Sequence, residues 1–140
     1  MATDMERMFK DYYAAWNSHD VDKIVSFFTD DGVHEDVAAG AVYRGKNELK
    51  AWLGALFVAS PDFKLELKSI FSAGDWVAQE WVMTGTQTGA LGGIPATGKS
   101  FSVRGATITE LRKDKIRREG DYWNQATLLQ QLGVMPGAPS

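Results

Sequence analysis

The sequence has 140 residues, a formal net charge of −3, 44% hydrophobic residues, two histidines and no cysteine. This composition allows one domain with a hydrophobic core and excludes disulfides and thiolate chemistry. The scattered basic residues argue against a nucleic-acid partner, and the two histidines argue against a histidine-rich metal site. No segment is apolar for long enough to form a signal peptide or to span a membrane. We therefore expect a cytoplasmic protein with no membrane partner, folded as one domain over residues 1–140 with a loose tail after about residue 133.

The first half of the chain has the hydrophobic spacing of helices. Thr3 and Glu6 form a capping-box pattern, and apolar residues then recur every three or four positions. Asp20 is a candidate N-cap for a second, shorter helix that carries Ile24 and Phe28, and residues 30–32 predict a turn. We expect helices over residues 4–18, from residue 20 to about 28 and over 46–59, with a short strand over 33–37.

In the second half the period changes to two, which is typical of strands. Phe63, Leu65 and Leu67 alternate with charged residues. We expect strands over residues 63–67, 76–88, 101–111 and 116–124, then a short final helix. Residues 113–115 predict a tight turn. The order of elements predicts an α+β fold, in which a curved, mostly antiparallel sheet is wrapped by the N-terminal helices around a cone-shaped pocket.

Residues 93–100 match the phosphate-binding P-loop pattern letter by letter. That motif requires a helix directly after the loop, so that backbone N–H groups at the helix N-terminus can bind phosphate. Here the next residues alternate, are rich in β-branched side chains and include Gly105. The sequence therefore predicts a hairpin connection and argues against a nucleotide site.

The last expected strand carries the candidate chemistry. Alternation along a strand places Glu119, Asp121 and Trp123 on one face. If this face lines a cavity, two carboxylates lie near an aromatic wall and become candidates for acid–base chemistry. If it faces water, they are ordinary surface residues, and Glu119 pairs with a neighbouring basic residue.

The chain resembles the SnoaL-like polyketide cyclase family of the NTF2-like superfamily. The resemblance covers nearly all of the chain and rests on Trp16, Asn17 and Asp20, and on residues 30–33, 43–46, 84–89, 93–99, 116–121 and 128–133. It implies the conical α+β fold, a homodimer, a small hydrophobic ligand and no cofactor. The implied reaction is an aldol-type ring closure, in which an aspartate on the last strand takes a proton from an activated carbon of a polyketide methyl ester.

Asp121 matches the position of this catalytic aspartate, whereas two nearby positions depart from the family pattern. Glu119 and Gly120 stand where many relatives carry a histidine and a tryptophan. The preceding strand has no histidine and offers Arg104 and Thr107 instead. These departures keep two alternatives open: hydrolase or isomerase chemistry of the epoxide hydrolase or ketosteroid isomerase type, with Asp121 and Arg104 handling a water or an enolate, and a domain that binds an apolar ligand without turnover.

The candidate site residues follow from these considerations. We expect Asp121 and Glu119 to be catalytic and no residue to bind a metal. His34 is expected on the surface or at the pocket rim. The expected ligand contacts are Tyr13, Trp16, Phe28, His34, Trp81, Arg104 and Trp123.

Overall fold

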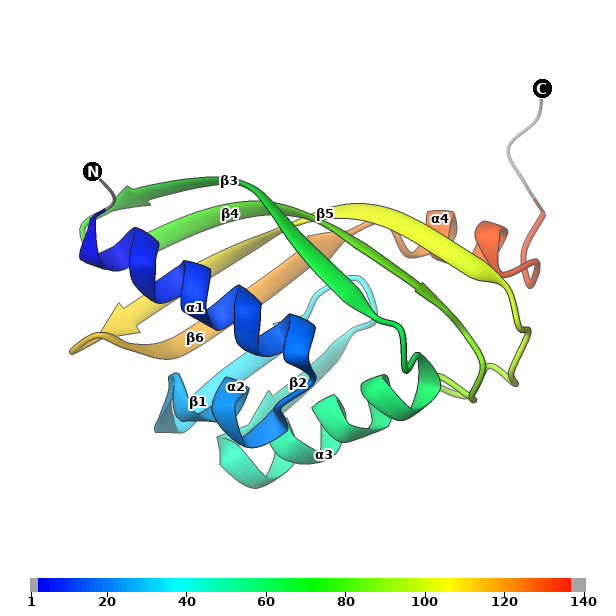
Figure 1. Cartoon of the computed structure of the whole chain (residues 1–140), viewed down its shortest axis with the longest axis horizontal. Coiled ribbons are helices and arrows are strands. Elements are labelled where there is room, and N and C mark those ends of the chain that lie inside the picture. The colour runs from blue at the N-terminus through cyan, green and yellow to red at the C-terminus, as the bar shows by residue number, and fades with distance from the viewer. Residues whose placement is uncertain (1–2, 137–140) are drawn as a thin grey trace.

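The structure is a computed structural model that describes residues 3–136. Four helices and six strands follow one another along these residues, and the predicted α+β fold is confirmed (Figure 1). Their order is α1 Asp4–Ser18, α2 Val21–Ser26, β1 Phe28–Asp36, β2 Ala41–Arg44, α3 Gly45–Ala59, β3 Lys64–Ala73, β4 Trp76–Thr86, β5 Ser100–Arg112, β6 Lys115–Trp123 and α4 Gln125–Gln131.

The six strands form one sheet in the order β2-β1-β6-β5-β4-β3. All neighbours are antiparallel except β1 and β6, which run parallel. The sheet curves over α1, α2 and α3, with α1 against β3 and α3 against β1 and β2, while α4 packs near the start of β5 (Figure 1). The inner face of the sheet and these helices enclose the core.

Side chains at the helix starts explain why three of the helices begin where they do. Thr3 accepts a hydrogen bond from the Glu6 N–H, and Asp20 accepts one from the Lys23 N–H. Asn124 does the same for the Thr127 N–H at the start of α4. Each contact satisfies a backbone donor that has no partner within its helix. The first two starts confirm the prediction.

Two predictions for the region around β1 are wrong, and one strand was missed. Phe28 begins β1 and does not belong to the second helix, which ends at Ser26. Residues 30–32 lie within β1, where the pairing with β6 shifts register between Phe28 and Val33. The edge strand β2 was not predicted at all, because it is only four residues long and its pattern is indistinct. Together these changes make β1 an interior strand, covered on both sides by β2 and β6.

The P-loop-like segment is a connection between two strands, as the sequence predicts. Ser100, its last residue, opens β5 and no helix follows. The expected tail after residue 133 has no helix or strand over residues 133–136, and its remainder lies outside the described residues. Over residues 3–136, none of the helices is long and apolar enough to cross a membrane.

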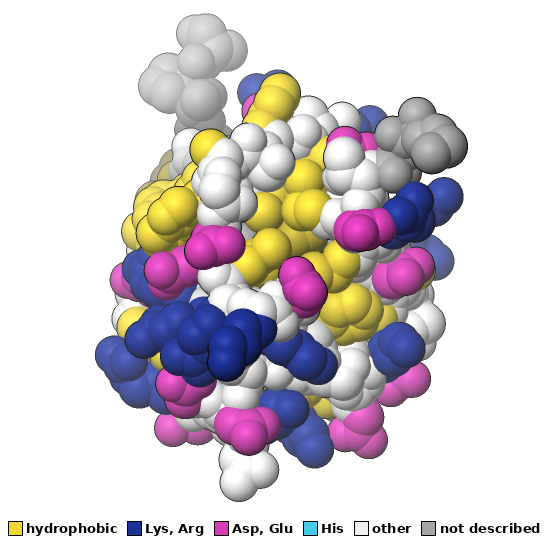
Figure 2. Space-filling view, turned by 90° about the vertical axis from the view of Figure 1, so that its left-hand side faces the viewer, with side chains coloured by type: hydrophobic (Ala, Val, Ile, Leu, Met, Phe, Trp, Pro, Cys, Tyr) yellow, Lys and Arg dark blue, Asp and Glu magenta, His cyan; other side chains and the backbone are white. Residues whose placement is uncertain are grey.

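The hydrophobic core lies between the inner face of the sheet and the helices. Its most completely buried large side chains include Phe9, Ile24, Leu49, Leu53 and Ile116. The end of the molecule with the β3–β4 and β5–β6 hairpins shows hydrophobic side chains in the middle of that face and charges of both signs around them (Figure 2). This mixed charge pattern is unlike the one-sided basic surface that binds nucleic acid.

Candidate active site

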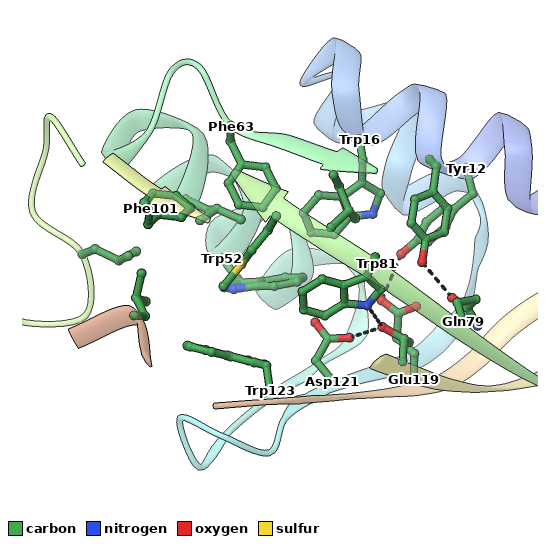
Figure 3. A pocket seen from close by; sticks show the side chains of 17 residues that line it. Tyr12, Trp16, Trp52, Phe63, Gln79, Trp81, Phe101, Glu119, Asp121 and Trp123 are labelled. Atoms are coloured by element: carbon green, nitrogen blue, oxygen red, sulfur yellow. Dashed lines mark hydrogen bonds between the residues drawn. The ribbon is translucent and has the colours of Figure 1, made fainter. Parts of the chain in front are cut away.

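A cavity opens between the inner face of the sheet, α1 and α3. Its empty volume is about 710 Å³, including open solvent at the mouth. The wall is largely aromatic and apolar, and the polar side chains gather at the Glu119 end, opposite Phe101 (Figure 3). The lining residues include Tyr12, Tyr13, Trp16, Trp52, Phe63, Gln79, Trp81, Leu91, Phe101, Thr107, Glu119, Asp121, Trp123 and Leu128.

Asp121 on β6 is held at the polar end by a relay of hydrogen bonds. The Thr107 hydroxyl donates to Asp121 Oδ1 at 2.6 Å, and the Trp81 indole N–H donates to Thr107 Oγ1 at 2.7 Å. The Asp121 side chain retains 19% exposure. Asp121 is thus oriented by the neighbouring strands and still reachable from the cavity.

Gly105 makes room for this relay. It lies opposite Trp81 in the β4–β5 pairing. A Cβ atom at Gly105 would overlap with the Trp81 ring, so only glycine lets the indole lie over the strand and reach Thr107.

His34 lies between the two carboxylates and is buried, so the expected surface or rim position is wrong. The parallel pairing of β1 with β6 places His34 opposite Glu119. His34 Nδ1 lies 2.8 Å from Glu119 Oε1, and Nε2 lies 3.2 Å from Asp121 Oδ2. The second distance suits an ion pair, although its angles do not make it a hydrogen bond.

The carboxylates keep His34 protonated. Burial alone would lower the pKa of the imidazole, but the charges and hydrogen bonds of Asp121 and Glu119 outweigh it and raise the His34 pKa to about 10. At neutral pH the centre is therefore an imidazolium between two acidic groups. In this form Nδ1–H donates to Glu119 Oε1, and Nε2 forms an ion pair with Asp121 Oδ2.

Glu119 is bound from two sides and is almost completely buried. Besides His34, the Tyr12 hydroxyl donates to Glu119 Oε1 at 2.9 Å. Burial and the Glu119 charge raise the pKa of Tyr12 well above its ordinary value, so the phenol stays neutral and donates. Glu119 therefore has the contacts of a residue that fixes His34, whereas Asp121 is the carboxylate that a ligand can reach.

An aromatic stack covers His34 on its other side. The Trp52 ring from α3 stacks on His34 with 4.0 Å between ring centroids, and Tyr43 from β2 stacks on Trp52 at 5.1 Å. A cation over an indole face is attracted by the ring electrons. Trp52 also lines the cavity, so this stack separates the imidazolium from solvent.

Two further pairs fix the polar end. The Trp123 indole N–H donates to Asp36 Oδ1 at 2.9 Å, and burial raises the pKa of Asp36, with the Asp121 charge adding to the increase. Between α1 and β4, the Tyr13 hydroxyl donates to Gln79 Oε1 at 3.2 Å. Within residues 3–136, no group of three or more His, Asp or Glu side chains has an arrangement that could hold a metal ion.

The model of the SnoaL-like polyketide cyclase family matches residues 6–132. The chain belongs to this family. The nogalonic acid methyl ester cyclase of Streptomyces nogalater is 27% identical over 123 residues, which cover 86% of this chain and 90% of that protein.

Solved structures of two other proteins have the same fold. AclR from Streptomyces galilaeus, which is proposed to be a hydroxylase, is 27% identical with a TM-score of 0.83, covering 98% of this chain and 85% of that one. TsrD from Streptomyces laurentii superposes with a TM-score of 0.85 at 24% identity, covering 96% and 99%, and supports the fold alone.

Most of the residues proposed from the sequence meet in the cavity of this SnoaL-like chain. Glu119, Asp121 and Trp123 share one face and line it, as do Tyr13, Trp16 and Trp81. Arg104, Phe28 and His34 do not line it. Arg104 is exposed on the outer face of β5, beside Tyr122 of β6. Phe101 and Val103 point inward, so the next residue, Arg104, points outward. Phe28 is buried in the core against Tyr12.

The site also contains residues that the sequence analysis did not select. Tyr12, Trp52, Gln79 and Asp36 take part through contacts between elements far apart in the chain, and no local pattern reveals them. Thr107 was noted only as a replacement for histidine. The family pattern has a histidine on the strand before β6. In this structure the histidine near Asp121 is His34, which comes from β1 on the other side of β6.

Proposed function

We propose that this SnoaL-like protein is a cofactor-independent enzyme that performs an aldol-type ring closure on a hydrophobic, carbonyl-bearing small molecule, with Asp121 as the general base and acid. The observation that carries the proposal is the placement of Asp121. It is reachable from an apolar cavity, oriented by Thr107 and paired with a protonated His34. A general base must reach the proton that it takes and must be held in a fixed geometry.

The proposed reaction needs only proton transfer and one new carbon–carbon bond. The Asp121 carboxylate takes a proton from a carbon that is activated by neighbouring carbonyl groups, and an enolate forms. The enolate carbon attacks a second carbonyl carbon of the same molecule, whose oxygen becomes an alkoxide. Protonated Asp121 returns the proton to this oxygen. The His34 imidazolium offsets the negative charge at the polar end during these steps.

The alternatives have less support in the contacts of the site. An epoxide hydrolase-like Asp–Arg unit would need Arg104 beside Asp121, and Arg104 lies on the other face of the sheet. A domain for binding alone would not require a buried ionic centre, because its polar groups cost desolvation energy. The related Streptomyces nogalater protein is a methyl ester cyclase by name, which agrees with the proposed class of reaction.

We also propose that the protein acts as a homodimer through the outer face of the sheet. Phe71, Ala78 and Ile108 form an apolar row across β3, β4 and β5 on this face, and Phe71 is 64% exposed. Glu80 and Arg104 lie beside the row. A second copy related by a twofold axis would bury the row and bring charges of opposite sign together.

Replacing Asp121 by asparagine tests the proposed chemistry. Asp121→Asn keeps the size of the side chain and its contact with Thr107 but removes the base. We expect turnover of polyketide methyl esters that the parent accepts to fall about 10²- to 10⁴-fold, measured by product analysis with ligand binding in parallel. Turnover equal to that of the parent would refute the role of Asp121 as the general base.

A further inference from the structure

The connection between β4 and β5, residues 87–99, lies at the apolar end of the cavity. Leu91 from this connection lines the cavity together with Phe101 and Leu128. Phe101 lies across the cavity from Glu119 (Figure 3). A ligand that extends from Asp121 toward Phe101 therefore meets Leu91.

The connection is fixed by the side chain of Gln87, which is completely buried. Its Nε2 donates to the carbonyls of Ile94 and Pro95, both at 3.2 Å. Its Oε1 accepts from the Thr97 N–H at 3.2 Å and from the Thr97 hydroxyl at 2.7 Å. The amide thus uses both donors and both acceptor positions on the connection.

Leu91 stands on a small hairpin within the connection. Leu91 and Ile94 exchange two backbone hydrogen bonds of 2.9 and 2.8 Å. The two residues between them, Gly92 and Gly93, both have positive φ angles, of 54° and 83°. This is the geometry of a tight two-residue hairpin turn that glycine favours. The direction of the Leu91 side chain is therefore set by the backbone.

The start of the connection is attached to α3. The backbone N–H groups of Thr88 and Gly89 both donate to the carbonyl of Ala59, each at 3.0 Å. A Cβ atom at Gly89 would lie 3.1 Å from the Val58 carbonyl oxygen. The connection is thus a fixed wall, bound to α3 at its start and to the Gln87 side chain through residues 94, 95 and 97.

We propose that Leu91 limits how far a ligand can extend from Asp121, and that Gln87 is the positioning residue that holds Leu91 in place. This inference rests on the proposed function in one respect, namely that the acidic carbon of the ligand lies at Asp121. It assigns the ligand an elongated shape, with its carbonyl groups at the polar end and an apolar tail that ends at Leu91.

Binding of a homologous series of methyl 3-oxoalkanoates tests the proposal. These esters have no second ketone to close on, so their affinity can be followed without turnover by the fluorescence of the tryptophans that line the cavity. For the parent, each added methylene should improve affinity about fourfold until the tail meets Leu91, after which affinity falls. Leu91→Ala should move the preferred length to longer tails, and Leu91→Phe to shorter ones.

Ile94→Ala is the matched control, because it removes the same number of carbons from the same small hairpin at a position that does not line the cavity. It should leave the preferred length unchanged. Gln87→Met should weaken the discrimination against long tails while leaving the affinity for short tails, which do not reach Leu91, as in the parent.

The results separate this proposal from the proposed function. An unchanged preferred length in both Leu91 variants, an equal shift in Ile94→Ala, or no binding of the series by the parent would overturn the role of Leu91. Length-dependent binding that shifts as expected, together with turnover that does not depend on Asp121, would retain the role of Leu91 and refute the proposed chemistry.

Discussion

At the scale of single residues, the site depends on how Asp121 is oriented and charged. Sequence alternation alone places Glu119, Asp121 and Trp123 on one face, and the structure confirms that this face lines the cavity. His34 could not be assigned in this way, because its contact with Glu119 joins positions 85 residues apart. Arg104, in contrast, can be placed from the local pattern alone. It follows the inward-facing Val103 on β5 and therefore lies on the outer face.

Gly105→Ala tests whether the Trp81–Thr107 relay orients Asp121. The new methyl group would displace the Trp81 ring and break its hydrogen bond to Thr107. We expect kcat to fall by up to about 100-fold, as for small misplacements of a catalytic group, with a smaller change in KM. Gly54→Ala is the matched control, because its Cβ atom meets nothing within 4 Å. Equal kcat values in parent and Gly105→Ala would refute a role for the relay.

At the scale of elements, local sequence patterns predicted most helices and strands, but they did not predict how the strands pair. The first helix, the four long strands and the final helix follow from caps and periodicity. The short β2 and the parallel contact of β1 with β6 were missed, because pairing between distant segments leaves no local pattern. That missed contact brings His34 into the site. The fold was therefore more predictable than the centre it supports.

The outer face of the sheet is the element on which the proposed dimer depends. Ile108→Arg places a charge in the middle of the apolar row formed with Phe71 and Ala78. We expect the mass measured by light scattering to fall from that of a dimer to that of a monomer. Val58→Arg, at an exposed position on α3, should not change the mass. A parent protein that is already monomeric, or a variant that remains dimeric, would contradict the proposed interface.

At the scale of the whole molecule, the buried imidazolium links stability to pH. The His34 pKa is about 10 in the folded protein and about 6.5 in the unfolded chain. Because the folded state holds the proton more tightly, this contribution to stability is fully present below about pH 6.5 and is lost as the pH rises through 10. The free energy of unfolding should fall across this window by up to about 1.4 kcal/mol per pH unit.

Urea unfolding between pH 6.5 and 10 measures this slope. His34→Gln removes the titrating group, so its stability should be lower at neutral pH and should depend less on pH over the same window. A parent and a His34→Gln variant with the same slope would mean that His34 is not protonated between the carboxylates.

The central claim, that Asp121 takes a proton from carbon, is tested most directly by hydrogen exchange. In D₂O, NMR follows the replacement by deuterium of the proton at C2 of methyl 3-oxodecanoate, the carbon between its two carbonyl groups. We predict exchange above the uncatalysed rate with the parent and a loss of about 10²- to 10⁴-fold in Asp121→Asn. Equal exchange rates for the two proteins would contradict the account.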